Sequence, residues 1–230
     1  MRQTPARQLL DGWETFRGQP MPVRAAALAA LLTGQPLAEA MRWSVPRRDQ
    51  ALFDCRAQVF GDHVEAVTSC PACAEQLEMH LAPAQIAPSK GGAAAPSSAF
   101  RSVRIGGSRV RCRLPNSEDL LAVASLTDIA EAREQLISRC VQSDDPHLRE
   151  QAAALLAHQA DDVQLNLTCP ACGHAWQTGF DIAAFVWREL DDWAERTLHE
   201  IHMIASAYGW SESEILELSA RRRQTYVEMI

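Results

Sequence analysis

The sequence predicts an α+β fold that is mainly α-helical and contains β-hairpins. Apolar residues recur at helical spacing over most of the 230 residues. Two identical Cys-Pro-Ala-Cys tetrapeptides, at 70–73 and 169–172, lie beside segments in which polar and apolar residues alternate. With 47% hydrophobic and 22% charged residues, the chain has the composition of a globular protein with one sizeable domain, or one domain and an appendage.

These patterns divide the chain into six segments. They are an N-terminal helical region, a first cysteine hairpin, a low-complexity linker, an inserted hairpin with helices, a second cysteine hairpin and a C-terminal helical region. Their respective bounds are 1–61, 62–86, 87–98, 99–160, 161–180 and 181–230.

The N-terminal region is expected to form helices over 5–17, 22–32 and 46–60. Trp13, Trp43 and Cys55 fall on apolar stripes and are expected in the core. The alanine-rich run 25–32 is far shorter than the roughly 20 residues that span a bilayer, so it predicts a core helix rather than a membrane span or a signal peptide. We therefore expect a soluble cytoplasmic protein.

The two tetrapeptides belong to an internal repeat. In each copy the second cysteine precedes a segment with a period of two, which predicts a β-hairpin bent at the cysteines. Gly173 follows the second tetrapeptide, where a left-handed residue often closes the turn. Ala74 occupies the equivalent position in the first copy, and we expect it to cost about 1 kcal/mol or to reshape the turn.

Cys70, Cys73, Cys169 and Cys172 are the predicted metal ligands. The spacing lets both sulfurs of one tight turn reach a single ion, and two such turns supply the four thiolates of a structural zinc site. The expected core is therefore zinc-ribbon-like, with Zn²⁺ as a structural cofactor. A rubredoxin-like iron site with the same ligands and a thioredoxin-like redox couple are the alternatives. His174 is expected near the site or at the surface rather than as a ligand.

The insertion between the cysteine hairpins predicts a further hairpin around Gly106 and Gly107, followed by three helices. The helices are expected to start at Ser117 and to cover 128–141 and 146–158. The predicted hairpin carries arginines, placed ahead of its first strand and at its outward positions: Arg101, Arg104, Arg109, Arg111 and Arg113. This basic strip favours a solvated face or a surface for an acidic protein partner. A contact with nucleic acid is the less favoured alternative.

After the second cysteine hairpin, a long helix is expected over 181–208, with Gly209 as its cap. Ser211 and Glu214 form a capping-box pattern for a short helix. The last segment contains an arginine run, 221–223, interleaved with apolar residues, which predicts a helix that docks a partner. Candidate partner-binding residues beyond the long helix are Trp210, Tyr226 and Met229.

No catalytic signature occurs in the sequence. A phosphate-binding glycine loop, a nucleophile elbow and a His-Glu-x-x-His motif are all missing, so we expect no enzymatic activity. The formal net charge of −7 argues against a dedicated nucleic-acid binder, which usually carries a basic face.

The combination of motifs resembles a known family. A helical start and a Cys-Pro-x-Cys turn are followed by Leu-Thr-Cys-Pro-Ala-Cys-Gly-His-x-Trp at 167–176 and by Phe-Asp-Ile-Ala-Ala-Phe-Val-Trp-Arg-Glu-Leu at 180–190. The likeness ends at Tyr-Gly-Trp-Ser-Glu-Ser-Glu-Ile-Leu, 208–216. The chain is similar here to the T-even-phage-type baseplate hub assembly chaperones, whose bacterial relatives belong to phage-tail-like contractile injection systems.

The resemblance implies a non-enzymatic assembly role, with baseplate hub or spike proteins as partners. It is most specific from residue 165 to the C-terminus. The main alternative is a zinc-ribbon regulator that binds nucleic acid through the arginines at 101–113 and 221–223. A permanent baseplate subunit is the other alternative.

Overall fold

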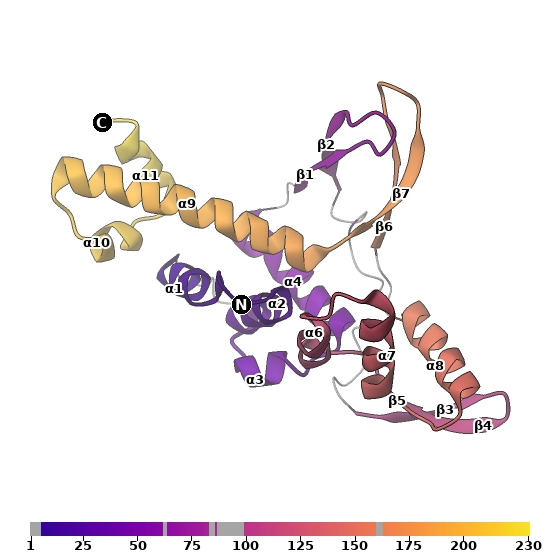
Figure 1. Cartoon of the computed structure of the whole chain (residues 1–230). Helices are drawn as coiled ribbons and strands as arrows, with labels where there is room; N and C mark the ends of the chain where they lie inside the picture. The colour runs from indigo at the N-terminus through magenta and orange to yellow at the C-terminus, as the bar shows by residue number, and fades with distance from the viewer. Residues whose placement is uncertain (1–5, 62–63, 83–85, 87–98, 160–162) are drawn as a thin grey trace.

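The computed structural model describes residues 6–61, 64–82, 86, 99–159 and 163–230. The described part is a mixed α+β fold, mainly helical, with three small antiparallel sheets (Figure 1). The expected mainly α-helical α+β class is therefore confirmed. The predicted linker at 87–98 lies outside the described residues.

The N-terminal helices are α1 (Ala6–Phe16), α2 (Met21–Thr33), α3 (Leu37–Ala40) and α4 (Val45–Phe60). Helix α2 is the alanine-rich run, and it lies among α1, α3, α4, α6 and α9. Its alanines at 25–30 are all buried, which small side chains permit because they let neighbouring backbones approach closely. The expectation of a core helix is confirmed. No helix in the described ranges is both long and apolar enough to cross a bilayer.

The two cysteine hairpins are β1 (Val64–Ser69) with β2 (Gln76–Leu81), and β6 (Val163–Thr168) with β7 (Ala175–Phe180). They extend side by side away from the helices (Figure 1). Val64, at the base of the first hairpin, and Leu165, in the middle of β6, are buried and belong to the main core.

The last strand leads directly into α9 (Ile182–Tyr208), the longest helix. Trp13 Nε1 donates a 2.6 Å hydrogen bond to Asp191 Oδ1, which joins α9 to α1. Arg56 donates two hydrogen bonds to the carboxylate of Glu189 and so joins α9 to α4. Two short helices follow, α10 (Glu212–Glu217) and α11 (Ala220–Val227), and both pack on α9. The predicted capping box of Ser211 and Glu214 is present.

The insertion forms a second, smaller core. Strands β3 (Arg101–Ile105), β4 (Ser108–Cys112) and β5 (Val141–Gln142) make one sheet, with helices α6 (Ser117–Val123), α7 (Ile129–Cys140) and α8 (Pro146–Gln159) around it. The apolar residues of β4, α7, β5 and α8 pack together and away from the main core. The backbone N–H of Val45 donates to the carbonyl of Pro115 at the junction with the N-terminal helices.

The expected start of a helix at Ser117 is confirmed, and two other local predictions for the insertion were wrong in detail. Helix α6 begins at Ser117, and its cap is Asn116, whose side chain accepts a hydrogen bond from the N–H of Asp119. Val141 ends the helical geometry of α7 and starts the short strand β5, which pairs with β4. Arg113 is not an outward strand residue, since it lies beyond β4 and its guanidinium binds the buried carboxylate of Asp119.

Like charges oppose each other across the β3–β4 hairpin. Arg104 pairs directly with Arg109 in the antiparallel register. Because like charges opposite one another destabilise a strand pair, Arg109→Thr should raise the free energy of unfolding by about 0.5 kcal/mol. Urea denaturation of Arg104→Thr, Arg109→Thr and the double variant measures this. Either single change removes the repulsion, so additive gains would contradict the interpretation.

Candidate metal centre

The four predicted metal ligands meet at the tips of the two cysteine hairpins. The Sγ atoms of Cys70 and Cys172 are 3.7 Å apart, and so are those of Cys73 and Cys169. All four sulfurs lie within 4.8 Å of one another. Each short separation joins one hairpin to the other, so the cluster ties together residues 102 positions apart in the chain.

The two cysteine turns have the same backbone hydrogen bonds. The N–H of Cys70 donates to the carbonyl of Glu75 over 2.8 Å, and the N–H of Cys169 donates to the carbonyl of His174 over 2.9 Å. In each turn the residue after the second cysteine donates back to the first cysteine, from Ala74 to Cys70 and from Gly173 to Cys169. The internal repeat of the sequence is therefore a structural repeat.

Ala74 keeps this shared turn at a conformational cost. Its φ is +60°, and among the described residues no other non-glycine residue has a positive φ. The equivalent Gly173 has φ +74°, a conformation that glycine adopts freely. Of the two expectations for Ala74, the cost in free energy fits the structure, and a reshaped turn does not.

Ala74→Gly should therefore stabilise the protein by about 1 kcal/mol, because it removes the left-handed penalty of a residue with a Cβ. The matched change Gly173→Ala should destabilise the protein by a similar amount. A Cβ at Gly173 would meet no atom within 4 Å, so that loss reports backbone conformation rather than a clash. Guanidinium denaturation of both variants in the metal-loaded state checks the pair. Equal effects of the same sign would contradict it.

Each turn buries its first cysteine and exposes its second, so Cys70 and Cys169 face the protein while Cys73 and Cys172 face solvent. Burial raises the pKa of the Cys70 thiol, but hydrogen bonds from the backbone of Ala72 and Cys73 and from neighbouring thiols outweigh it and lower that pKa to about 7. For Cys73 the backbone N–H of Glu75 lowers the pKa, whereas the thiols around it and burial raise it to about 12. Without a metal, the Cys70 thiol therefore loses its proton at a lower pH than the Cys73 thiol.

This donor set fits a metal ion. Four thiolates about 2.3 Å from a tetrahedral metal must lie about 3.8 Å from one another, close to the 3.7 Å of the two pairs across the hairpins. His174 stacks against Trp176, with ring centroids 6.0 Å apart, and is not among the clustered ligands. In the part of the chain that the structure describes, no second group of three or more His, Cys, Asp or Glu side chains is close enough to hold a metal.

The three candidate partner-binding residues lie at the far end of α9. Trp210 and Tyr226 are half-buried and pack edge to face, with ring centroids 5.0 Å apart. Both also contact Tyr208, which was not among the predicted partner-binding residues. Met229 is 67% exposed. An aromatic cluster of Tyr208, Trp210 and Tyr226, beside an exposed Met229, forms an apolar surface at this end.

The C-terminal arginine run is divided by the fold. Arg223 is buried, and its Nε donates a 2.8 Å hydrogen bond to Glu200 of α9. Its Nη1 also donates to the carbonyl of Leu218. Arg221 and Arg222 are exposed. One of the three arginines therefore fastens α11 to α9 and is not available to a polyanion.

Comparisons of the chain with protein-family models, with curated proteins and with solved structures find no match. The cluster geometry defines a four-cysteine centre that can hold a metal ion.

Proposed function

We propose that the chain is a non-enzymatic assembly factor for the baseplate hub of a phage-tail-like contractile injection system, and that it acts in the cytoplasm and is stabilised by one structural Zn²⁺. The metal centre carries the structural half of this proposal. Four thiolates close a tetrahedral site and leave no position for a substrate or a reactive water, which is the arrangement of structural rather than catalytic zinc. Zinc then shapes a zinc-ribbon-like pair of knuckles.

The functional half is supported by the resemblance from residue 165 to the C-terminus. Its terminal motif, 208–216, corresponds in the structure to the end of α9, the aromatic cluster and the capping box of α10. We assign Trp210, Tyr226 and Met229 to a surface that covers an apolar region of a hub or spike subunit. Aromatic residues and methionine are the side chains enriched in such contacts.

A nucleic-acid-binding regulator has less support. Two of the arginines that suggested it, Arg113 and Arg223, are held by the carboxylates of Asp119 and Glu200 inside the protein. The exposed arginines that remain are divided between two separate elements, the β3–β4 hairpin and α11.

Affinity purification of the tagged chain from a host that encodes such a particle tests the proposal. We expect mass spectrometry to identify baseplate hub or spike subunits, and metal analysis of the same sample to find one zinc per chain. Recovery of nucleic acid or transcription proteins without baseplate proteins would overturn it. Finding the chain in stoichiometric amount in finished particles would instead make it a permanent subunit.

The partner surface needs a surface variant rather than a truncation. Removing everything after Gly209 would delete Ile215, which is fully buried in the main core, so lost binding could reflect unfolding. Met229→Asp changes an exposed side chain and should reduce hub recovery about tenfold or more. Ile129→Asp, at an 85% exposed position on α7, is the matched control and should leave recovery unchanged.

A further inference from the structure

The β3–β4 hairpin presents one positively charged face. The register places Ser102 beside Arg111 and Arg104 beside Arg109, and these four side chains share the face that points away from the second core. Gln142 of β5 lies next to Arg111 across the other strand pair. The opposite face carries the apolar residues that pack against α7 and α8: Val103, Ile105, Val110 and Cys112.

Nothing in the described structure neutralises this face. Arg104 and Arg109 form no ion pair or hydrogen bond with any described side chain, and the three strands contain no acidic residue. Arg111 lies over the ring of Phe100, 5.7 Å from its centroid, which orients the guanidinium without removing its charge. The rest of the chain is acidic, with a formal net charge of −7 for the whole.

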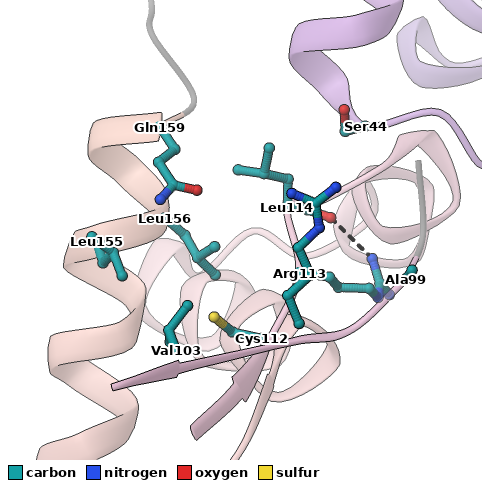
Figure 2. Close-up of a pocket in the computed structure, with 10 residues that line it drawn as sticks. Ser44, Ala99, Val103, Cys112, Arg113, Leu114, Leu155, Leu156 and Gln159 are labelled. Carbon is teal, nitrogen blue, oxygen red and sulfur yellow. Dashed lines mark hydrogen bonds between the residues drawn. The ribbon is translucent and has the colours of Figure 1, made fainter. Parts of the chain in front are cut away.

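Arg113 does not belong to this face. Figure 2 shows it in the cavity of about 180 Å³ behind the hairpin, where a hydrogen bond joins it to the carbonyl of Leu114. Val103 and Cys112 point into the same cavity, toward Leu156 of α8. Arg101 is exposed too, but it lines the cavity together with Val103. The exposed arginines of this face are therefore Arg104, Arg109 and Arg111, which we call the arginine face.

We propose that the arginine face binds an extended acidic segment of a partner protein. Arg109 and Arg111 are two residues apart on one strand, so their side chains repeat about every 7 Å, and alternate carboxylates of an extended chain have the same repeat. Each guanidinium can bind a carboxylate with two parallel hydrogen bonds. Arg104, opposite Arg109, widens the face by one strand. Bound carboxylates would also remove the repulsion between this opposed pair.

A nucleic acid fits the same face less well. Three arginines neutralise at most about three phosphates, which supports only weak binding with a shallow salt dependence. A nucleic acid long enough to extend past the face would also be repelled by the net negative charge of the protein. A short acidic segment ends where the arginines end and avoids this repulsion. This inference does not depend on the proposed function, because it concerns the chemistry of a surface distant from α11 (Figure 1).

Fluorescence anisotropy of the full chain with a short labelled peptide of alternating Glu and Thr, at low salt, tests the inference. We expect saturable binding that the double variant Arg104→Glu/Arg109→Glu weakens at least about tenfold. Arg221→Glu/Arg222→Glu removes two exposed arginines from α11 and is the matched control, with unchanged affinity expected. Arg109→Thr, a change expected to stabilise the fold, should also weaken binding, which separates lost contacts from unfolding.

Three results would overturn the inference. The unaltered chain could fail to bind the peptide at low salt, or the arginine-face double variant could bind it as well as the unaltered chain does. The third is tighter binding of a labelled single-stranded oligonucleotide than of the peptide through the same arginines, which would assign the face to nucleic acid.

Discussion

Removal of zinc is expected to cost about 10 kcal/mol of apparent stability, which is comparable with the whole free energy of unfolding of a typical domain. The physical reason lies in the two cysteine hairpins. Each is an isolated two-stranded sheet, and such hairpins are marginal in water without further support. Few of their residues are buried in the main core, and Val64 and Leu165 are among them. The metal is therefore expected to hold the tips together.

Hydrogen exchange before and after chelation, with thiols kept reduced, measures this effect. We expect the largest loss of protection in peptides that cover 64–81 and 163–180. Cys73→Ser should abolish stoichiometric zinc binding, because three thiolates no longer close the site. Addition of the chelator should then cause no further loss of protection in this variant. Cys55→Ala, at a buried cysteine outside the cluster, is the matched control for loss of a thiol and should retain one zinc per chain.

Two outcomes would contradict the zinc assignment. Purified protein with reduced thiols that binds no zinc would remove the metal from the proposal. Iron in place of zinc, seen by metal analysis and by its visible absorption, would keep the four ligands and change the ion.

The metal centre was predictable because its signals are local. A tetrapeptide with two cysteines fixes one half of the site, and alternation on either side predicts the hairpin that presents it. A second identical tetrapeptide then implies that the halves meet, although nothing in the spacing says at what distance. The positive φ of Ala74 was also foreseeable, since Gly173 occupies the equivalent position of the repeat.

Short elements and distant pairings were not predictable in the same way. Helix α3 has four residues and β5 has two, too few for any periodicity to appear. Arg113 continues an alternating strand pattern in the sequence, yet the fold turns it inward. Its partner Asp119 lies on α6 and is buried because that helix packs against α2 and α7. The alternation of arginines with apolar residues in the sequence therefore predicted one more outward arginine, Arg113, than the fold has.

Replacement of the buried carboxylate at Asp119 is expected to have the second largest effect. Asp119 is fully buried and accepts hydrogen bonds from both Nη atoms of Arg113, from Nε of Arg139 and from the N–H of Asn116. These contacts join the segment that follows β4 to α6 and α7. Asp119→Asn keeps the shape but leaves two guanidinium groups without a counter-charge, which should cost about 3 kcal/mol at neutral pH. Arg139 is partly exposed, so water reduces the loss from the higher values of fully buried pairs.

The dependence on pH has a defined sign. Burial raises the pKa of Asp119, but the hydrogen bonds from Arg113, Asn116 and Arg139 outweigh burial and hold the pKa below its usual value. A carboxyl whose pKa is lowered by folding stabilises the protein fully above its unfolded pKa of about 3.9. That contribution is lost as the pH falls through the lower pKa of the folded state. The gap in stability between the unaltered chain and Asp119→Asn should therefore close in acid.

Urea denaturation of both proteins at a series of pH values checks the sign, and the difference between them cancels acid effects on the metal ligands that both share. Glu118→Gln is the matched control, because Glu118 precedes Asp119 on the same helix and its carboxylate forms an exposed ion pair with Arg42. It should change stability by about 0.5 kcal/mol or less at any pH. If Asp119→Asn reduced the free energy of unfolding as little as Glu118→Gln does, Arg113 and Arg139 would have to be solvated or paired with other groups. A gap that stays constant down to pH values well below 3.9 would show that the amide fails for reasons of hydrogen bonding alone, and that the charge of Asp119 contributes nothing to holding the insertion together.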